Sequence, residues 1–372
     1  MKKLLLLSLI LSMLLTMASC DLLKSFIPDG EGDFAGGEGD GSSETGGDSS
    51  GSSADKPDQV HKPKEKLTSW GLTYTLASNK KEYILTAAAG GTPEYNVPAE
   101  IEGLPVTEIA SGAFKNQLSL VKVTLPDSIR KINISIFEGC RNLRELDIPF
   151  IGESGTTSSA NNTNCIGYFF DTESPAGADG WTGTSMGTPY TDSYIQYWVP
   201  ESLGVIRLRG GATWEHTFKG AQLTEVYLGS GIHHIPTGLF GGQKALVSVT
   251  CENDITSVGK EAFWNCYNLE NFRITGKSPW IGMVELENCH DLEWIILSAG
   301  TTDIQNLAFD DCESFKSIYY LGTPDDFDKI DKGTNNYELM QATVYIYSGT
   351  EPAAEGNWWH YDEANMPVVW GE

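Results

Sequence analysis

Residues 113–126 read AFKNQLSLVKVTLP, and this stretch is the repeat unit that decides the fold. Its phenylalanine, which we call the marker, returns along the chain at a nearly constant spacing. Phe240 and Phe263 are 23 positions apart, as are Phe114 and Phe137. The markers are Phe114, Phe137, Phe218, Phe240, Phe263 and Phe309, with Leu286 in the marker's place in one unit. A fixed period of this kind predicts a repeat architecture.

Apolar residues keep a constant phase behind each marker. In the first unit Leu120, Val123 and Leu125 stand six, nine and eleven positions after Phe114. Positions nine and eleven are two apart, so both side chains point to one side of a strand. Repeats of about 20–29 residues with this leucine spacing are typical of leucine-rich solenoids.

The repeat resembles a known family. The residues that carry the resemblance are Leu104–Ile109, Ala113, Phe114, Leu120, Val123, Leu125, Pro126, Ile129 and Ile132. They resemble the BspA-like leucine-rich repeat of bacterial surface proteins, over about residues 67–372. The resemblance implies one short strand per turn in a parallel sheet, a second extended segment and a short helical turn near the marker.

We therefore predict a leucine-rich-repeat solenoid, mainly β with parallel strands and short helical turns, and with N- and C-terminal caps. Caps are expected because an end repeat would otherwise expose its core. About seven turns, spaced by roughly 4.7–4.9 Å, would make the solenoid roughly 35 Å long.

Composition, repeat phase and the resemblances to the family's caps and to a bacterial lipobox together divide the chain into seven predicted segments. They are a lipoprotein signal peptide (1–19), a lipidated cysteine with a disordered acidic Gly/Ser linker (20–66), an N-terminal β cap (67–105), a first repeat block (106–150), an insertion (151–205), a second repeat block (206–321) and a C-terminal cap (322–372). The insertion breaks the period, and inserted segments of repeat proteins often gather on the binding face.

The N-terminus predicts export and attachment to a membrane. Lys2 and Lys3 precede an apolar run over residues 4–17, which is too short to span a bilayer stably. Residues 17–20, MASC, resemble a bacterial lipobox, which implies that Cys20 is acylated and becomes the first residue of an outward-facing, membrane-anchored protein. The alternative is an ordinary signal peptide that is cleaved nearby.

The segment after the cysteine is predicted to be a tether. Residues 30–53 consist almost wholly of Gly, Ser, Asp, Glu and Thr, so they cannot bury enough apolar surface to fold. With a random-coil reach of about 5–6 Å times the square root of its length, a spacer over residues 28–66 spans roughly 35 Å. It would lift a folded domain away from the membrane.

The charge balance limits the classes of partner. The formal net charge is −25, and no basic stripe interrupts the acidic excess. Phosphate backbones require clustered Lys and Arg, so this balance argues against a nucleic-acid partner. No cofactor motif is present, and no metal site is predicted.

Four of the seven cysteines stand three positions after a marker; they are Cys140, Cys266, Cys289 and Cys312. We interpret them as small buried side chains stacked in a ladder. Disulfides between neighbouring turns remain an alternative. Cys165 and Cys251 have no partner that the sequence reveals, and no two cysteines have the close spacing of a zinc site.

Positions eight and ten after each marker are predicted to point away from the core. The pairs are Lys122/Thr124, Glu145/Asp147, Glu225/Tyr227, Ser248/Thr250, Asn271/Arg273, Trp294/Ile296 and Ser317/Tyr319. Clustered exposed aromatic side chains usually form a contact surface. The predicted binding face therefore consists of Tyr227, Arg273, Trp294, Ile296 and Tyr319. The alternative is that the C-terminal cap folds over these residues.

These features favour binding over catalysis. The resemblance implies an adhesin-like surface protein whose partner is a protein or a glycan on host or neighbouring cells. One alternative is a cell-envelope scaffold, and another is a glycan-binding or glycan-active protein with Trp181, Tyr194, Tyr197 and Trp198 as a sugar platform. Residues 183–187 match G-x-S-x-G but lack the strand–turn–helix context of a catalytic serine, so no enzyme is predicted.

Overall fold

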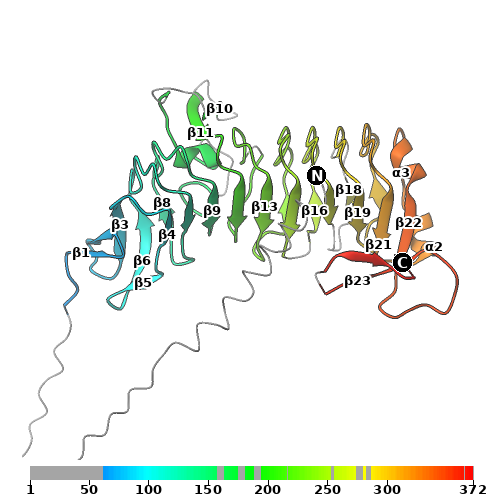
Figure 1. Cartoon of the computed structure of the whole chain (residues 1–372), viewed down its shortest axis with the longest axis horizontal. Helices are drawn as coiled ribbons and strands as arrows, with labels where there is room; N and C mark the ends of the chain where they lie inside the picture. Colours follow the sequence, from blue (N-terminus) through cyan, green and yellow to red (C-terminus); the bar gives the residue numbers. More distant parts are fainter. Residues whose placement is uncertain are drawn as a thin grey trace, which may run out of the picture. The chain divides into compact units, whose positions relative to one another are not determined.

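One long sheet runs along the solenoid (Figure 1). The computed structural model describes residues 62–156, 163–174, 181–187, 194–215, 217–252, 255–273, 280–281, 286–363 and 365–371, all within one unit over residues 61–372. Within these residues the turns of the solenoid contribute ten parallel strands to this sheet, one per turn. They are β4 (Glu94–Asn96), β7 (Lys122–Thr124), β9 (Glu145–Ile148), β12 (Val205–Leu208), β13 (Glu225–Leu228), β15 (Ser248–Cys251), β17 (Asn271–Arg273), β19 (Trp294–Leu297), β21 (Ser317–Tyr320) and β22 (Thr343–Tyr347). The predicted fold class, a mainly β leucine-rich-repeat solenoid, is confirmed.

The solenoid has about ten turns, and the prediction of about seven was wrong. The three additional strands are β4, β12 and β22. None of them follows a phenylalanine at the spacing of the repeat, because β4 and β22 lie near the ends of the solenoid and β12 follows the segment in which the period breaks. A search based on the marker could not find them.

Two smaller sheets complete the walls. The second extended segment of four successive turns forms a parallel sheet of β14 (His234–Ile235), β16 (Ser257–Val258), β18 (Trp280–Ile281) and β20 (Asp303–Ile304). The N-terminal sheet consists of β1 (Lys66–Ser69), β2 (Leu72–Leu76), β3 (Tyr83–Ala88), β5 (Glu100–Ile101), β6 (Leu104–Ile109) and β8 (Lys131–Ile132). In this sheet β2 runs antiparallel to both β1 and β3, and these strands close this end of the core.

Each marker lies at a tight corner of its turn. The residue two positions after the marker has a positive φ, between 56° and 90°, at Asn116, Gly139, Gly220, Gly242, Asn265, Asn288 and Asp311. Asn, Asp and Gly are the residues that adopt this conformation most readily. Backbone hydrogen bonds join each corner to the next, as from Phe240 N to Ala262 O at 2.9 Å. The helical turn expected near the marker is a single hydrogen-bonded turn, as from Cys266 N to Phe263 O at 3.0 Å.

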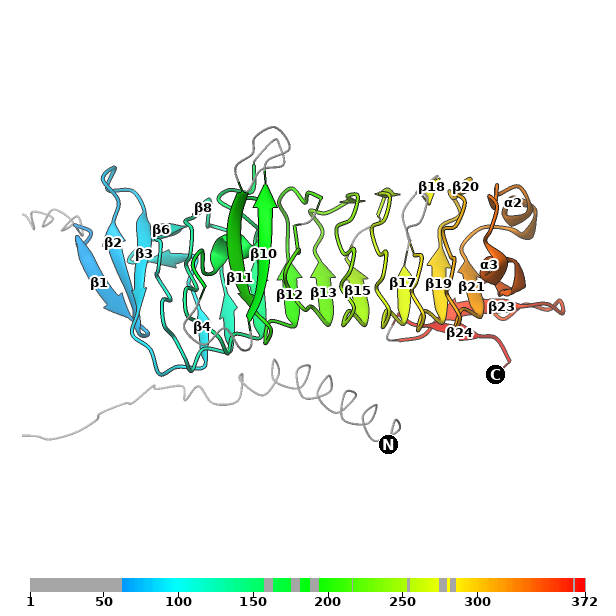
Figure 2. The same ribbon diagram turned by 90° about the horizontal axis from the view of Figure 1, so that it is seen from above.

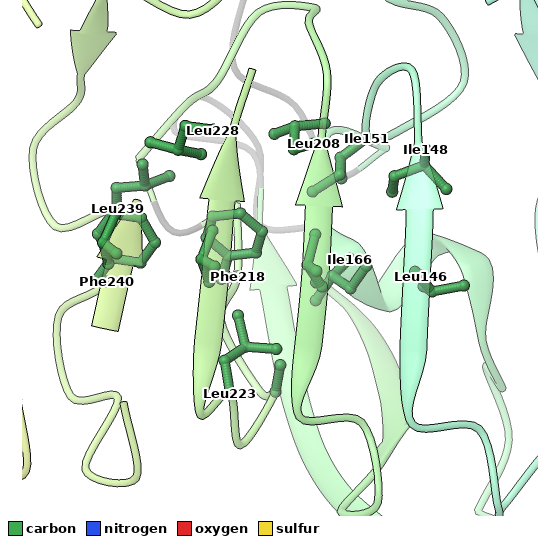
Figure 3. Packing of buried hydrophobic residues seen from close by; sticks show 14 of the residues in the cluster. Leu146, Ile148, Ile151, Ile166, Leu208, Phe218, Leu223, Leu228, Leu239 and Phe240 are labelled. Atoms are coloured by element: carbon green, nitrogen blue, oxygen red, sulfur yellow. The ribbon is translucent and has the colours of Figure 1, made fainter. Parts of the chain in front are cut away.

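The markers form the centre of the core. The rings of Phe218, Phe240 and Phe263 are fully buried and stack on one another, with centroids 5.4 and 5.0 Å apart. Figure 3 shows Phe218 and Phe240 in a row behind the strands, with Ile166 continuing the row behind β12. Because every ring touches its neighbours, each turn depends on the turns beside it for its buried surface.

The cysteine side chains of the ladder form hydrogen bonds in addition to filling space in the core. Each thiol donates a hydrogen bond to the carbonyl of the previous turn's marker, as from Cys266 Sγ to Phe240 O at 3.2 Å and from Cys289 Sγ to Phe263 O at 3.3 Å. Gln243 occupies the same repeat position and donates to Phe218 O at 3.0 Å. All six cysteines of the described residues are free. Burial raises the pKa of the Cys266 thiol to about 12, so it stays protonated.

Part of the segment that breaks the period completes a turn of the solenoid. The Phe170 ring lies 5.8 Å from the ring of the marker Phe137, and Phe137 N donates to Phe169 O at 2.8 Å, as at the regular corners. The residues just before Phe170 form the short helix η2 (Ile166–Phe169). The chain then leaves the solenoid in an antiparallel hairpin of β10 (Trp181–Gly187) and β11 (Tyr194–Pro200), which lies near β9 and β12 in both views (Figures 1 and 2).

The C-terminal segment folds back over the main sheet. After α2 (Pro324–Asp328), α3 (Tyr337–Gln341) and β22, the strands β23 (Trp358–Tyr361) and β24 (Pro367–Val369) form an antiparallel hairpin. Figure 2 shows this C-terminal hairpin running back from β22 toward β17. A contact between Arg273 Nη2 and Met366 Sδ at 2.9 Å fixes its position over β17.

Candidate binding surface

The outward side of the main sheet carries a network of charged side chains over β7, β9, β12 and β13. We call Lys122, Glu145, Arg207, Glu225 and Tyr227 the polar patch. Glu145 Oε1 lies 2.8 Å from Lys122 Nζ and 3.2 Å from Arg207 Nε. The Arg207 guanidinium carbon lies 3.8 Å from the centre of the Tyr227 ring, and Tyr227 donates to Glu225 Oε2 at 2.9 Å. Four neighbouring turns thus hold one another's side chains in place.

The charges of the polar patch stabilise one another despite partial burial. Burial alone would raise the pKa of Glu145, but hydrogen bonds from Lys122 and Arg207 outweigh it and hold this pKa below its ordinary value. Burial alone would lower the pKa of Arg207, but its contacts with Glu145 and Tyr227 raise it. Both groups are therefore ionised at neutral pH, and the guanidinium is oriented before any partner arrives.

A shallow hollow of about 140 Å³ opens beside the polar patch. Its lining residues are Asp147, Arg207, Leu208, Arg209, Tyr227, Gly229 and Glu252. Arg209 forms ion pairs with Asp147 and with Asp127 and also donates to Leu125 O. Its guanidinium group is therefore held in place by the two preceding turns. The surface therefore offers fixed donors, fixed acceptors and one aromatic ring within a few ångströms of one another.

The sequence prediction did not include Arg207. It identified no strand between the one that carries Glu145 and the one that carries Tyr227. The structure places its strand between them, with Arg207 opposite Asp147 on one side and Tyr227 on the other. A signal was present in the sequence. Ile206 and Leu208 are two apart and apolar, and they stand 20 positions before Val226 and Leu228. Without a phenylalanine marker this alternation was not recognised as a turn.

The predicted binding face is divided by the structure. Tyr227 lies in the polar patch, whereas Arg273, Trp294, Ile296 and Tyr319 lie toward the end that the C-terminal hairpin covers. Ile296 is 0% exposed, so the expectation that it contributes to an exposed surface was wrong. Its side chain points away from the main core, as the repeat phase predicts, but the tertiary fold covers it.

A second, smaller hydrophobic cluster explains this burial. Trp359, on β23, is 0% exposed and contacts Tyr319 with ring centroids 5.4 Å apart. Tyr319 in turn contacts Trp294 at 5.7 Å and stacks on Tyr345 at 5.3 Å. Burial beneath the same hairpin lowers the pKa of Arg273. We call Trp294, Ile296, Tyr319, Tyr345 and Trp359 the aromatic cluster.

The structure also shows where the residues of the predicted sugar platform and the G-x-S-x-G match lie. Tyr197, proposed for a sugar platform, is 0% exposed, because β11 turns it toward η2; its use as a platform was wrong. Trp198 is half-buried on the other side of β11, and the side chains of Trp181 and Tyr194 lie outside the described residues. The G-x-S-x-G match lies within β10 and not at a turn between a strand and a helix.

The predicted lipidation site, Cys20, lies outside the described residues. None of the helices in the described part of the chain is long and apolar enough to cross a membrane.

Comparison with known proteins agrees with the geometry of the repeat. A family model described as "BspA type Leucine rich repeat region" matches six copies over residues 104–166 and 214–337, about half of the chain. No curated protein matches the chain.

Solved structures of bacterial leucine-rich repeat proteins are also similar. A leucine-rich repeat protein of T. pallidum shares 18% identity over 68% of this chain and 81% of its own, with a TM-score of 0.25. A leucine rich cell surface protein of Faecalibacterium prausnitzii shares 16% identity over 73% and 98%, with a TM-score of 0.26. A leucine-rich repeat protein of Bacteroides ovatus shares 14% identity over 75% and 99%, with a TM-score of 0.28.

Proposed function

The chain belongs to the BspA-type leucine-rich repeat family, and from this premise we propose that it is a lipid-anchored, adhesin-like surface protein that binds a protein on host or neighbouring cells. The polar patch is the contact surface in this proposal. It is the observation that carries the proposal, because its charged side chains are preorganised and remain accessible on the outward side of the sheet.

The chemistry of the polar patch suits a protein partner. A carboxylate, a guanidinium and an aromatic ring lie together on neighbouring strands, and Arg and Tyr are enriched among residues that dominate interface energies. The side chains are already held by hydrogen bonds, so a partner does not have to order them on binding. Acidic and basic groups alternate, which favours a complementary protein surface over a uniformly charged polymer.

A binding screen tests this surface. The chain from Asp21 to Glu372 would be assayed against extracellular-matrix proteins and a glycan array, together with the double variant Arg207→Ala/Tyr227→Ala. We expect a protein ligand whose dissociation constant rises by about 10-fold or more in the double variant, the size of a hot-spot loss.

Lys131→Ala is the matched control, since it removes an ion pair with Glu108 at 3.2 Å outside the main sheet. Equal binding by all three proteins would move the site away from the polar patch. Glycan binding without protein binding would favour the glycan-binding alternative, and silence on both panels would favour an envelope scaffold. Each of these outcomes contradicts the proposal.

The anchor is tested separately. In the full chain expressed in a bacterium with a lipoprotein-processing pathway, Cys20→Ser should move the protein from the membrane fraction to the exported soluble fraction. Mass spectrometry of the wild-type N-terminal peptide should show acyl chains on the cysteine. Membrane retention of the variant would exclude Cys20 as the attachment point, without bearing on the polar patch.

A further inference from the structure

The hairpin outside the solenoid has one strand edge with which no described strand pairs. β10 pairs with β11 along its whole length, from Trp181 opposite Pro200 to Gly187 opposite Tyr194. The other edge of β11 is tied to the solenoid, because Trp198 N donates to Asp171 O at 2.8 Å. Among the described strands β10 pairs only with β11, and we call its far edge, along which no described strand lies, the open edge.

The register shows which backbone groups face the open edge. Trp198 points its N–H away from β10, so it and its partner Gly183 form a pair without mutual hydrogen bonds. The pair of Trp181 and Pro200 lies two residues from this pair and should likewise lack mutual hydrogen bonds. Pro200 has no N–H, which agrees with this expectation. Ser185, two residues beyond Gly183, therefore also directs its N–H and C=O to the open edge.

This edge lacks the usual protection against strand pairing. Natural edge strands carry charged side chains, proline or a bulge that prevent another chain from adding to the sheet. β10 reads WTGTSMG, with no charged residue and no proline, and its pairing with β11 shows no register shift. With seven residues, β10 and β11 are also the longest strands of the described residues.

The two strands of the hairpin are electrically neutral in a strongly acidic protein, although Asp192 lies in the segment that connects them. Neither of its two strands contains Asp, Glu, Lys, Arg or His, although the chain carries a net charge of −25. Screening limits charge repulsion to about 8 Å at physiological ionic strength, so the charge at the contact itself matters most. Two copies of this chain can therefore approach at the hairpin with little local repulsion. A positively charged partner would not need a neutral surface on this acidic chain, so the neutral strands favour a second copy as the partner.

We propose that two copies of the chain pair through β10, edge to edge and antiparallel, to form a four-stranded sheet. Antiparallel pairing of one strand with itself is compatible with a two-fold axis, which is the commonest symmetry of protein dimers. The surface is separate from the polar patch, so each dimer would present two patches. This arrangement would strengthen attachment to a multivalent partner without any new contact.

Sedimentation equilibrium of the chain from Asp21 to Glu372 tests the proposal. We expect a concentration-dependent monomer–dimer equilibrium. Ser185→Pro should raise the dimer dissociation constant by about 10-fold or more, because symmetry removes one edge donor from both copies. Proline is tolerated where the N–H of an edge strand faces solvent, so the hairpin itself should persist.

Two further variants make the test specific. Ser185→Ala keeps the backbone N–H and should dimerise like the wild type. Ser185→Lys keeps it too, but brings like charges together near the axis and should weaken the dimer, so it serves if the proline variant fails to fold. A wild-type chain that is monomeric at every concentration would overturn the proposal, as would a dimer that neither Ser185→Pro nor Ser185→Lys weakens.

Discussion

The outward side of the main sheet has two regions that differ although their repeat positions are equivalent. Tyr227 on β13 and Ile296 on β19 both stand at an outward position of their strands. Tyr227 is partly exposed and takes part in the polar patch, whereas Ile296 is fully buried near the C-terminal hairpin. The same repeat position therefore carries a partly accessible side chain on β13 and a fully buried one on β19.

The difference follows from the chemistry of the side chains and from what covers them. Lys122, Glu145 and Arg207 satisfy one another by hydrogen bonds and leave their charges near water. Trp294, Ile296 and Tyr319 would expose a contiguous apolar surface, which is unfavourable in a monomer. The C-terminal hairpin covers part of that surface, so that Ile296 is fully buried and Trp294 and Tyr319 are only partly exposed. Repeat phase thus determines the direction of a side chain, and the rest of the fold determines whether solvent reaches it.

The largest expected effect comes from placing a charge at equivalent outward positions of the two regions. Ile296→Lys would bury an unpaired ammonium group and should lower the free energy of unfolding by about 3–5 kcal/mol. Thr250→Lys, at the same position on the exposed part of β15, should change it by no more than about 0.5 kcal/mol. Urea denaturation of the two variants measures both values. Similar stabilities would show that the hairpin does not seal the aromatic cluster.

A smaller effect is expected when the aromatic cluster is loosened without adding charge. Trp359→Leu removes ring contacts with Tyr319, Tyr347 and Tyr361 and the hydrogen bond from Nε1 to Tyr320 O at 3.2 Å. We expect a loss of about 2 kcal/mol.

Trp264→Leu provides the matched comparison, because this tryptophan is 40% exposed at a corner of the solenoid. Its replacement should stay within about 0.5 kcal/mol of the wild type. Thermal or urea unfolding of both variants decides the matter, and equal losses would mean that Trp359 is no better packed than a surface residue.

The smallest expected effect is a pH dependence confined to the polar patch. The pKa of Glu145 is lowered in the folded chain, so its ionised form stabilises the fold above its unfolded pKa of about 4.3. This contribution is lost as the pH falls through the lower folded value. Glu145→Gln should therefore cost about 0.5 kcal/mol at pH 7 and progressively less below about pH 4.

The aromatic cluster offers the contrast for this titration. Any stability lost in Trp359→Leu should depend much less on pH over the same range, since no carboxylate is removed. Unfolding curves of Glu145→Gln and of Trp359→Leu, each paired with the wild type, test this difference between neutral pH and the lowest pH at which the fold persists. A Glu145→Gln effect that grows on acidification would reverse the sign derived for this carboxylate.

Several features could be read from the sequence because they depend on local spacing. The phase of positions nine and eleven placed Val123, Leu146 and Ile318 in the core, and all three are fully buried in the structure. The ladder of cysteines was also expected to be buried. Its hydrogen bonds to the previous marker were not foreseen, although Gln243, a good donor at the same position, was a signal for them.

Other features needed the fold because they join residues that are distant in the sequence. Arg207 meets Glu145 across 62 positions, and it was missed because the intervening segment hides the turn that carries β12. Phe170 was hidden in the same way, since it lies ten residues later than the period predicts. The contact between Arg273 and Met366 spans 93 positions, and no repeat pattern encodes it.

The sequence by itself determined the solenoid, because a period of 22 or 23 residues repeats the same local choice of strand, corner and buried marker in seven of its turns. It also determined which side chains leave the core on the outward side. Only the tertiary structure decided which of those side chains remain accessible and that β10, within the long insertion, has an edge with which no described strand pairs. These outcomes depend on the paths of the two segments that do not repeat, and a path through space is fixed by packing against distant residues, not by local spacing.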